Sequence, residues 1–201
     1  MQARLSAKDI ACRRGERLLF RRLSFALEPG EALQVAGANG IGKSSLLRIL
    51  GGLLRPFAGD VQRQGSAGLL DERLALDETV TLGTALDFWR RLDGSGDRAP
   101  LDRLSVTDLL DVPVRYLSTG QRKRAAMARL VGAKAAIWLL DEPLNGLDDE
   151  ARLTVERLAA EHCADGGICV IASHQPFMLE GNRTLTLADY AAFREAEGSQ
   201  E

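Results

Sequence analysis

The chain has 201 residues, of which 45% are hydrophobic and 27% charged, and its formal net charge is −2. This composition is ordinary for a globular protein, so we expect residues 1–201 to form a single domain. The near-neutral charge gives no broad basic surface, and we therefore expect no nucleic-acid partner. No apolar stretch is long enough to span a bilayer and the first residues lack the apolar region of a signal peptide, so we expect neither.

The first part of the chain leads to a glycine-rich loop. Residues 3–27 favour short strands, among them Ser24–Leu27. Ala32–Ala36 (ALQVA) is an apolar run typical of a buried strand. The octapeptide GANGIGKS follows at Gly37–Ser44, and after it comes the helix-like run Ser45–Leu54. This order of strand, loop and helix is the context in which GxxxxGK[ST] predicts a phosphate site.

The chemistry of a phosphate explains the residue types in this loop. Glycines let the backbone curl with its N–H groups facing an anion, and the N-terminus of the next helix adds partial positive charge. Lys43 supplies a full charge for the outer phosphates, and the hydroxyl of Ser44 can ligate Mg²⁺. We therefore predict that the chain binds a nucleoside triphosphate. The loop residues assigned to this binding are Gly37, Ala38, Asn39, Gly40, Ile41, Gly42, Lys43, Ser44 and Ser45.

The middle of the chain predicts a strand pair and a small helical region. Val61–Leu70 favours the strand pair. Gly83–Leu92 has a helix-like pattern, Gly94–Pro100 is a loose segment, and Leu101–Asp111 favours a second, short helix. We expect the helices to form a compact subdomain at about 83–117.

A short motif of small and polar residues opens the next predicted helix. Residues 117–121 read LSTGQ, and the helix runs over Gln121–Val131. It carries the basic cluster Arg122-Lys123-Arg124 together with Arg129. We interpret this cluster as a solvated helix face.

Two acidic residues follow the next apolar run, Ala135–Leu140. Asp141 is therefore predicted to stand at the carboxyl end of a buried parallel strand, where α/β sheets place their ligand groups and where a carboxylate can hold Mg²⁺. The side chain of Glu142 points elsewhere, because side chains alternate along a strand, and it is well placed to act as a general base on water. A predicted helix (Asp149–Cys163) and a predicted strand (Ile168–Ser173) follow, and His174 closes that strand.

Taken in order, these motifs resemble the ATP-binding-cassette ATPase family. The features are a Walker A loop, LSxGQ, a Walker B strand ending in Asp-Glu-Pro, a D-loop at Leu144–Asp148 and a strand closed by histidine. The resemblance covers essentially the whole chain. It implies an α/β fold of the P-loop NTPase type, with an antiparallel β flank and a small helical subdomain. It also implies ATP hydrolysis, with ATP and Mg²⁺ as ligands.

The resemblance further implies a second copy of the chain. Cassettes of this family dimerise head to tail and enclose two ATP molecules. By analogy, the signature residues Ser118, Gly120 and Gln121 would contact the ATP held by the other copy. His174 would hydrogen-bond the γ-phosphate, and Asp148 would couple the two sites.

Two segments depart from the commonest pattern of the family. The glutamine expected after the strand that follows the first helix is missing, and Leu70 or Asp71 takes its place by spacing. We interpret Asp71 as a loop carboxylate rather than a Mg²⁺ ligand. Where an aromatic residue usually stacks on adenine, the chain has Arg13 or Arg14. We interpret this arginine as a surface residue and Phe20 as part of the core.

Longer segments resemble a smaller group, the ATP-binding subunits of the bacterial haem exporter of cytochrome c biogenesis. These segments are CRRGERLLFRRLSFAL, LDERLALDETVTLGTALDFWRRLDG and the short C-terminal tail. The resemblance implies a polytopic membrane partner and a peripheral position on the cytoplasmic face of the bacterial inner membrane. An apolar surface around Phe88 and Trp89 would mark the groove that receives that partner. The alternative is that both aromatic residues simply pack into the small subdomain. We expect no direct haem ligation, because His162 and Cys163 lie at a predicted helix end without a haem motif.

Two other functions remain open at this point. The same motifs would serve the ATPase subunit of another small importer or exporter. They would also serve a soluble cassette that acts in cofactor or iron–sulfur cluster assembly. The motifs identify the ATPase but not the molecule that it transports.

Overall fold

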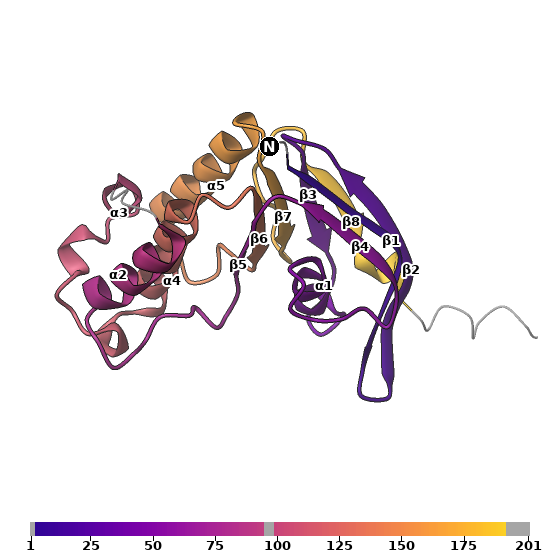
Figure 1. Cartoon of the computed structure of the whole chain (residues 1–201), viewed down its shortest axis with the longest axis horizontal. Helices are drawn as coiled ribbons and strands as arrows, with labels where there is room; N and C mark the ends of the chain where they lie inside the picture. The colour runs from indigo at the N-terminus through magenta and orange to yellow at the C-terminus, as the bar shows by residue number, and fades with distance from the viewer. Residues whose placement is uncertain (1–2, 95–98, 192–201) are drawn as a thin grey trace, which may run out of the picture.

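The computed structural model describes residues 3–94 and 99–191, which form two β-sheets and a helical layer (Figure 1). The strands are β1 (Arg4–Arg14), β2 (Arg17–Leu27), β3 (Ala32–Ala36), β4 (Ala58–Gln64), β5 (Ala67–Leu70), β6 (Ile137–Asp141), β7 (Ile168–Ala172) and β8 (Arg183–Thr186). The α-helices are α1 (Lys43–Leu50), α2 (Leu82–Asp93), α3 (Ala99–Arg103), α4 (Thr119–Gly132) and α5 (Asp149–Ala164). The short 3₁₀ helices are η1 (Thr107–Leu109), η2 (Val114–Tyr116) and η3 (Leu187–Tyr190). No helix in these ranges combines the length and apolar character needed to cross a membrane.

A parallel sheet with the strand order β5-β6-β7-β3-β8 forms the centre of the fold. Every residue of β6 and β7 is buried, because these mainly apolar runs are covered on both faces. The carboxyl ends of β3, β6 and β7 lie side by side, since Val35 and Asp141 both pair with Ala172. Parallel α/β sheets bind ligands at this edge. The predicted α/β core is confirmed.

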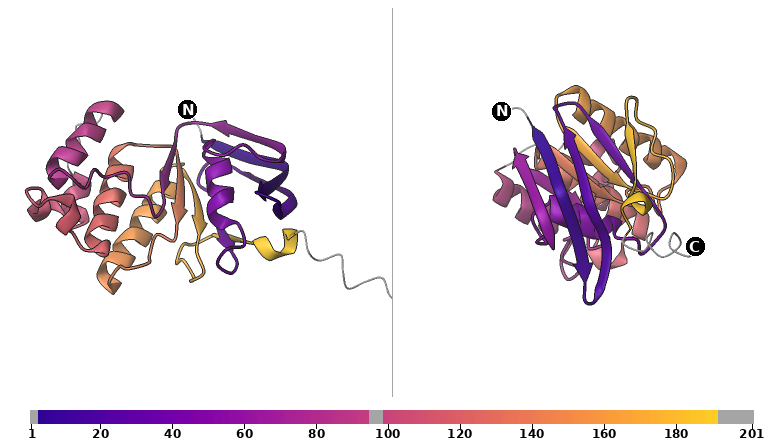
Figure 2. Two further views of the ribbon diagram at one scale, coloured as in Figure 1. Left: turned by 90° about the horizontal axis from the view of Figure 1, so that it is seen from below. Right: turned by 90° about the vertical axis from the view of Figure 1, so that its right-hand side faces the viewer.

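The antiparallel flank is confirmed too, but its strands are longer than predicted. It has the order β2-β1-β4 and lies beside the parallel sheet (Figure 2). The expectation of short strands in residues 3–27 is wrong, because β1 and β2 have 11 residues each. Their pairing shifts in register between Ala7 and Ile10, and again further along. Such irregularities break the alternation of buried and exposed side chains by which a long strand is recognised.

The strand pair predicted at Val61–Leu70 is also wrong. β4 and β5 do occupy this region, but they belong to different sheets. The chain passes from one sheet to the other at Gly65, whose φ is 103°. A Cβ atom at Gly65 would lie 2.9 Å from the Cβ atom of Ala136, so only glycine fits this crossing.

Helix α1 fills the space between the two sheets (Figures 1 and 2). Its buried Leu46, Leu47 and Leu50 share a hydrophobic cluster with Leu5 of β1 and Val35 of β3. The helix ends earlier than the sequence predicts, where two glycines follow it. Because α1 is held on both sides, the loop that precedes it has a fixed position.

Helices α2, α3 and α4 lie on the other side of the parallel sheet, at the left of Figure 1. Their buried side chains share a second hydrophobic cluster with α5, β6 and β7. The single helix predicted at Leu101–Asp111 is wrong, because α3 ends at Arg103 and η1 begins only at Thr107. Ser105 lies between them with a φ of 52°, a left-handed conformation that an α-helix cannot continue. The bounds of a subdomain at about 83–117 stay a prediction.

The end of the described chain is a single short turn. η3 covers Leu187–Tyr190, and the short C-terminal tail noted in the sequence follows it. Residues 192–201 of that tail lie outside the described residues, as do residues 95–98 of the predicted loose segment.

Candidate nucleotide site

The loop between β3 and α1 has the backbone that its glycines predict. Gly37, Gly40 and Gly42 have φ values of 151°, 77° and 119°, which residues with a side chain rarely adopt. Nothing lies within 4 Å of a Cβ atom built on Gly40, so the loop is open on that side. Helix α1 begins at Lys43 directly after the loop, and its free N–H groups favour an anion there.

A cavity of about 390 Å³ lies beside this loop. It is formed by the loop, the end of β6 and the segment after β7, and its volume is within the range of ligand sites. The lining residues are Leu19, Asn39, Gly40, Gly42, Lys43, Ser44, Ser45, Glu72, Asp141, Glu142, Asn145 and His174. Of the predicted loop residues, Gly37, Ala38 and Ile41 do not line the cavity. The structure thus brings most of the predicted Walker A loop together with both acidic residues and His174.

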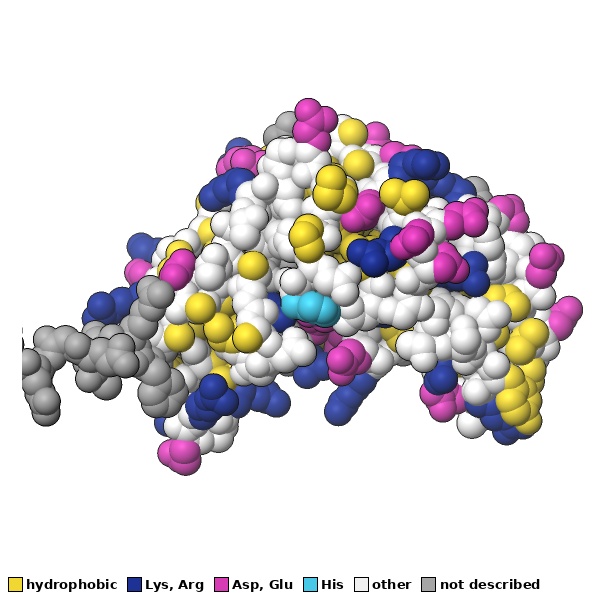
Figure 3. Space-filling model, turned by 180° about the vertical axis from the view of Figure 1, so that it is seen from behind, with side chains coloured by type: hydrophobic (Ala, Val, Ile, Leu, Met, Phe, Trp, Pro, Cys, Tyr) yellow, Lys and Arg dark blue, Asp and Glu magenta, His cyan; other side chains and the backbone are white. Residues whose placement is uncertain are grey.

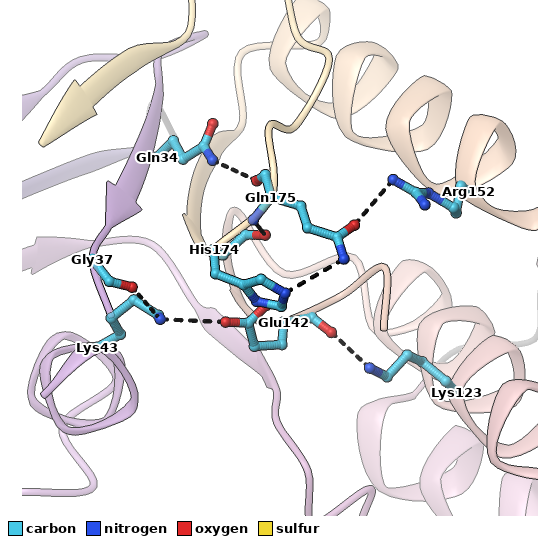
Figure 4. A network of polar contacts seen from close by, with 9 residues as sticks. Gln34, Gly37, Lys43, Lys123, Glu142, Arg152, His174 and Gln175 are labelled. Carbon is cyan, nitrogen blue, oxygen red and sulfur yellow. Dashed lines mark hydrogen bonds and ion pairs between the residues drawn. The ribbon is translucent and has the colours of Figure 1, made fainter. Parts of the chain in front are cut away.

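Lys43 is the charged residue of the loop and is 6% exposed. Its ammonium donates a hydrogen bond of 2.7 Å to the carbonyl of Gly37 and lies 3.4 Å from Oε1 of Glu142 (Figure 4). A buried ammonium needs such partners, because burial without them is costly. The same ammonium lines the cavity, where it attracts an anion.

Glu142 stands at the centre of the polar network in Figure 4. Its Oε2 atom lies 2.9 Å from Nδ1 of His174. Its Oε1 atom is buried and accepts no hydrogen bond from any described residue, although it is close to Lys43. A carboxylate oxygen in this condition can accept a proton or a hydrogen bond from a water molecule in the cavity.

Asp141 and Ser44 offer the oxygens for a metal ion. Burial raises the pKa of the Asp141 carboxyl, whereas a hydrogen bond from Ser44 lowers it. The negative charges of Glu142, Asp71 and Glu72 raise it further. A cation bound by Ser44 and Asp141 would relieve this repulsion, and Mg²⁺ usually takes only one or two protein carboxylates besides water and phosphate. Among the residues that the structure describes, no group of three or more His, Cys, Asp or Glu is arranged to hold a metal ion.

The side chain of Gln175 lies between the ring of His174 and Arg152. Nε2 of Gln175 lies 3.4 Å from Nε2 of His174, and its Oε1 atom accepts a hydrogen bond of 3.1 Å from Arg152 of α5. The main-chain carbonyl of Gln175 accepts another, of 2.8 Å, from the buried Gln34 of β3 (Figure 4). These contacts fix the segment after β7 against the strand that leads into the loop.

The signature residues lie outside the cavity of their own chain. Ser118 caps α4 through a reciprocal pair of hydrogen bonds with Gln121. Gly120 faces the main-chain carbonyl of Gly146, and a Cβ atom there would lie only 2.6 Å from that oxygen. Asp148 caps α5 by accepting a hydrogen bond from the backbone of Ala151. None of the residues Ser118, Gly120, Gln121 and Asp148 lines the cavity beside Lys43.

The basic cluster on α4 corrects the interpretation of a solvated face. Lys123 is 8% exposed and donates a hydrogen bond of 2.6 Å to the main-chain carbonyl of Glu142. Arg124 donates to the carbonyl of Leu104, and the guanidinium of Arg129 lies over the ring of Trp89. The helix packs between other elements, which its charge pattern alone does not reveal.

The residues at the two positions that depart from the family pattern, the missing glutamine and the missing aromatic residue, have contacts elsewhere in the chain. Asp71 forms an ion pair of 2.9 Å with Arg48 and does not line the cavity. The guanidinium of Arg13 lies over Phe57, while Phe20 is fully buried.

Three residues of the cavity were missed by sequence reasoning. Asn145 belongs to the D-loop segment, Glu72 adjoins Asp71, and Leu19 comes from β2. Asn145 could have been found from its motif, but Glu72 and Leu19 carry no local signal.

Comparison with known proteins decides the family. The family model described as ABC transporter matches residues 20–145. The chain belongs to the ABC transporter family. It is 59% identical over 186 residues to the cytochrome c biogenesis ATP-binding export protein CcmA of Novosphingobium aromaticivorans, covering 92% of this chain and 96% of that protein.

Further matches agree with this family. The chain is 46% identical over 192 residues to CcmA of Zymomonas mobilis subsp. mobilis, covering 94% of this chain and 87% of that protein. The solved structure of an ATP binding subunit of an ABC transporter matches with a TM-score of 0.76 at 21% identity. It covers 85% of this chain and 79% of that one, and it supports the fold alone. As an ABC family ATPase, the chain binds a nucleotide and couples ATP hydrolysis to transport.

Proposed function

We propose that this chain is the ATP-hydrolysing subunit of a bacterial exporter in cytochrome c biogenesis, the haem exporter that its sequence resembles. The observation that carries the proposal is the 59% identity to a cytochrome c biogenesis export protein over 92% of the chain. The cavity beside Lys43 supports it, because its residues suit ATP hydrolysis. The export step itself belongs to other subunits.

The residues of the cavity have separate roles in ATP hydrolysis. The loop N–H groups and Lys43 bind and orient the phosphates. Ser44 and Asp141 would hold Mg²⁺, which would supply positive charge to neutralise the negative charge on the phosphate oxygens. Glu142 takes the proton from the attacking water at Oε1, while His174 holds the other carboxylate oxygen.

The ion pair of Lys43 and Glu142 gives ATP binding a direct effect on the base. The ammonium of Lys43 has Glu142 as an anionic partner at 3.4 Å. A phosphate in the cavity gives Lys43 a second anionic partner and weakens its hold on Oε1. With ATP bound, Oε1 of Glu142 is then less strongly paired with Lys43 and more basic toward the attacking water.

A second copy of the chain completes the site in this proposal. Ser118, Gly120 and Gln121 do not line the cavity of their own chain, and neither does Asp148. The N-terminus of α4 is capped and carries the positive end of a helix dipole, which suits a phosphate. We infer a head-to-tail dimer in which this end of α4 meets the ATP of the other copy.

The membrane subunit docks on α2 in this proposal. Phe88 and Leu92 are 60% and 66% exposed on one face of this helix. Together with Thr84, Asp87 and Arg91 they line an open hollow of about 560 Å³. Figure 3 displays hydrophobic side chains gathered at the right edge of the molecule, over the helical layer. An apolar area of this kind marks an interaction site, and binding there would hold the chain on the cytoplasmic face of the inner membrane.

Recovery of the partners tests the function. A tagged Glu142→Gln variant, which is expected to hold ATP without hydrolysing it, is incubated with ATP and detergent-solubilised membranes. The bound proteins are identified by mass spectrometry. We expect a polytopic subunit together with cytochrome c maturation proteins. An unrelated permease would change the transported molecule, and soluble partners alone would replace transport by a role in cofactor assembly.

A second variant tests the docking surface in the same experiment. Phe88→Asp with Leu92→Asp is expected to lose the polytopic subunit while ATP binding is unchanged. Leu153→Asp places the same charge on an exposed leucine of α5 and is the matched control. Equal recovery of the membrane subunit by both variants would move the docking site away from α2.

A further inference from the structure

Lys123 is a buried cation that the mechanism described so far does not use. It lies on α4, shortly after the signature residues, and is 8% exposed. Burial lowers the pKa of its ammonium, while the negative charges of Glu142, Glu72 and Asp141 act in the opposite direction. Burying a charge is unfavourable unless it is paired and hydrogen-bonded. Its one hydrogen bond among the described contacts, 2.6 Å to the main-chain carbonyl of Glu142, therefore matters (Figure 4).

The backbone that this hydrogen bond holds is strained. Glu142 has a φ of 46°, a left-handed conformation that is uncommon for a residue with a side chain. Its N–H donates to the carbonyl of Ala172 at 2.8 Å, and its carbonyl also accepts from the N–H of Asn145 at 3.3 Å. Strain of this kind persists only where the surroundings impose it. Because the backbone sets the direction of the side chain, these contacts aim the carboxylate of Glu142 toward Lys43 and His174.

One face of α4 contacts both ends of the segment from Glu142 to Gly146. Gly120 and Lys123 are three positions apart on the helix, so they share a face. Gly120 approaches the carbonyl of Gly146 too closely for any side chain, and Lys123 contacts the carbonyl of Glu142. The signature end of α4 and the segment that carries the base are therefore packed as one unit.

We propose that Lys123 is a positioning residue that connects the signature helix to the catalytic carboxylate of the same chain. This inference rests on the proposed roles of Glu142 and of the signature residues. In the head-to-tail dimer, the signature end of α4 meets the ATP of the other copy, whereas Glu142 acts on the ATP of its own chain. When the site that contains the signature end of α4 closes around its ATP, Lys123 thus transmits the movement to Glu142, which is the base of the other site.

Substitution of Lys123 tests this role in the full chain. Lys123→Met keeps an apolar stem of similar length but removes the donor and the charge. We expect kcat for ATP hydrolysis to fall about 10- to 100-fold, as misplacement of a catalytic group does. The KM for ATP and the Kd measured by calorimetry should change less than about two-fold, because Lys123 does not line the cavity. Lys123→Arg, which can donate to the same carbonyl, should restore most of the turnover.

Lys134→Met is the matched control. It makes the same substitution and charge change at an exposed lysine just beyond the end of α4. We expect it to leave kcat unchanged. Should Lys123→Met fail to fold, Lys123→Gln carries the same expectations, because its shorter side chain does not reach the carbonyl.

A double variant separates this inference from the proposed function. If Lys123 acts through Glu142, Lys123→Met combined with Glu142→Gln should hydrolyse ATP no more slowly than Glu142→Gln alone, and it should still dimerise with ATP. Losses that multiply would overturn the positioning role, as would a lower ATP affinity with an unchanged kcat. Normal turnover by Glu142→Gln alone would instead overturn the role of the base itself.

Discussion

The two histidines of the chain lie near opposite ends of the same strand, β7, and they have different surroundings. His174 follows the carboxyl end, is partly exposed, and contacts Glu142. His162 lies near the amino ends of β6 and β7, stacked on Trp138 with ring centroids 4.1 Å apart. α/β sheets bind ligands at the carboxyl ends of parallel strands. The amino ends here border an open hollow of about 360 Å³ that His162 and Trp138 line, away from the glycine loop. The end of the sheet, rather than the residue type, decides which histidine does chemistry.

The largest expected effect comes from removing the base at the carboxyl end. Glu142→Gln keeps the size of the side chain but cannot accept a proton from water. We expect ATP turnover to fall roughly 10²- to 10⁴-fold, the usual contribution of a general base. Phosphate release measures the turnover, and gel filtration with ATP should reveal accumulated dimers. Near-normal turnover in this variant would contradict the assignment.

Lys43→Ala is expected to act on binding rather than on the chemical step. The ammonium of Lys43 supplies the full positive charge of the loop and is almost completely buried. We expect the affinity for ATP, measured by calorimetry, to fall about 30-fold or more, as for other buried charge pairs. An unchanged affinity would mean that the phosphates bind elsewhere.

How far the sequence predicts the site depends on whether the signal is local. The glycine loop, Asp141, Glu142 and His174 each stand next to an apolar strand, so a motif and its flanks suffice to predict their meeting at one edge of the sheet. Their individual roles remain predictions. The sequence indicates a solvated face at Lys123, whereas its burial depends on α4 packing against the segment after β6. Such a contact joins residues far apart in the chain and leaves no local pattern.

The strands of the two sheets also differ in how well the sequence predicts them, for the same reason. The short, strictly buried strands β6 and β7 were predicted to within a few residues, because apolar runs have one interpretation inside an α/β sheet. The long strands β1 and β2 were not, because register shifts interrupt their alternation. The assignment of β4 and β5 to different sheets depends on the turn at Gly65, which the sequence does not distinguish from a hairpin.

Asp71→Ala should have a small effect on turnover although Asp71 is near the cavity. The carboxylate of Asp71 pairs with Arg48 at 2.9 Å and does not line the cavity, so it is not free to replace the missing glutamine. We expect kcat to stay within about two-fold and the free energy of unfolding to fall by about 1 kcal/mol, the scale of a partly exposed ion pair. Urea denaturation measures the second quantity. A loss of turnover as large as that of Glu142→Gln would make Asp71 part of the catalytic machinery.

His162→Phe sharpens the comparison of the two histidines most directly. Phenylalanine preserves the stack on Trp138 but cannot be protonated. Burial lowers the pKa of His162, so the unfolded chain takes up a proton at a higher pH than the folded chain does. Stability is therefore lost as the pH falls through the ordinary pKa of histidine toward the lower folded value.

The variant should lose less stability than the native chain over this acid range, while its ATP turnover at neutral pH is unchanged. Thermal unfolding between about pH 7 and pH 5 measures the difference, because that range brackets the ordinary pKa of histidine. The ring nitrogen Nε2 of His162 is buried and has no hydrogen-bond partner among the described residues. Backbone contacts with Ala136 and Ile168 and the charge of Asp165 raise the pKa of His162, but burial outweighs them. An identical acid profile for the two proteins would mean that the stack opens to water before the chain unfolds. A loss of ATP turnover would instead show that a change at the amino ends of the strands affects the nucleotide site at their carboxyl ends.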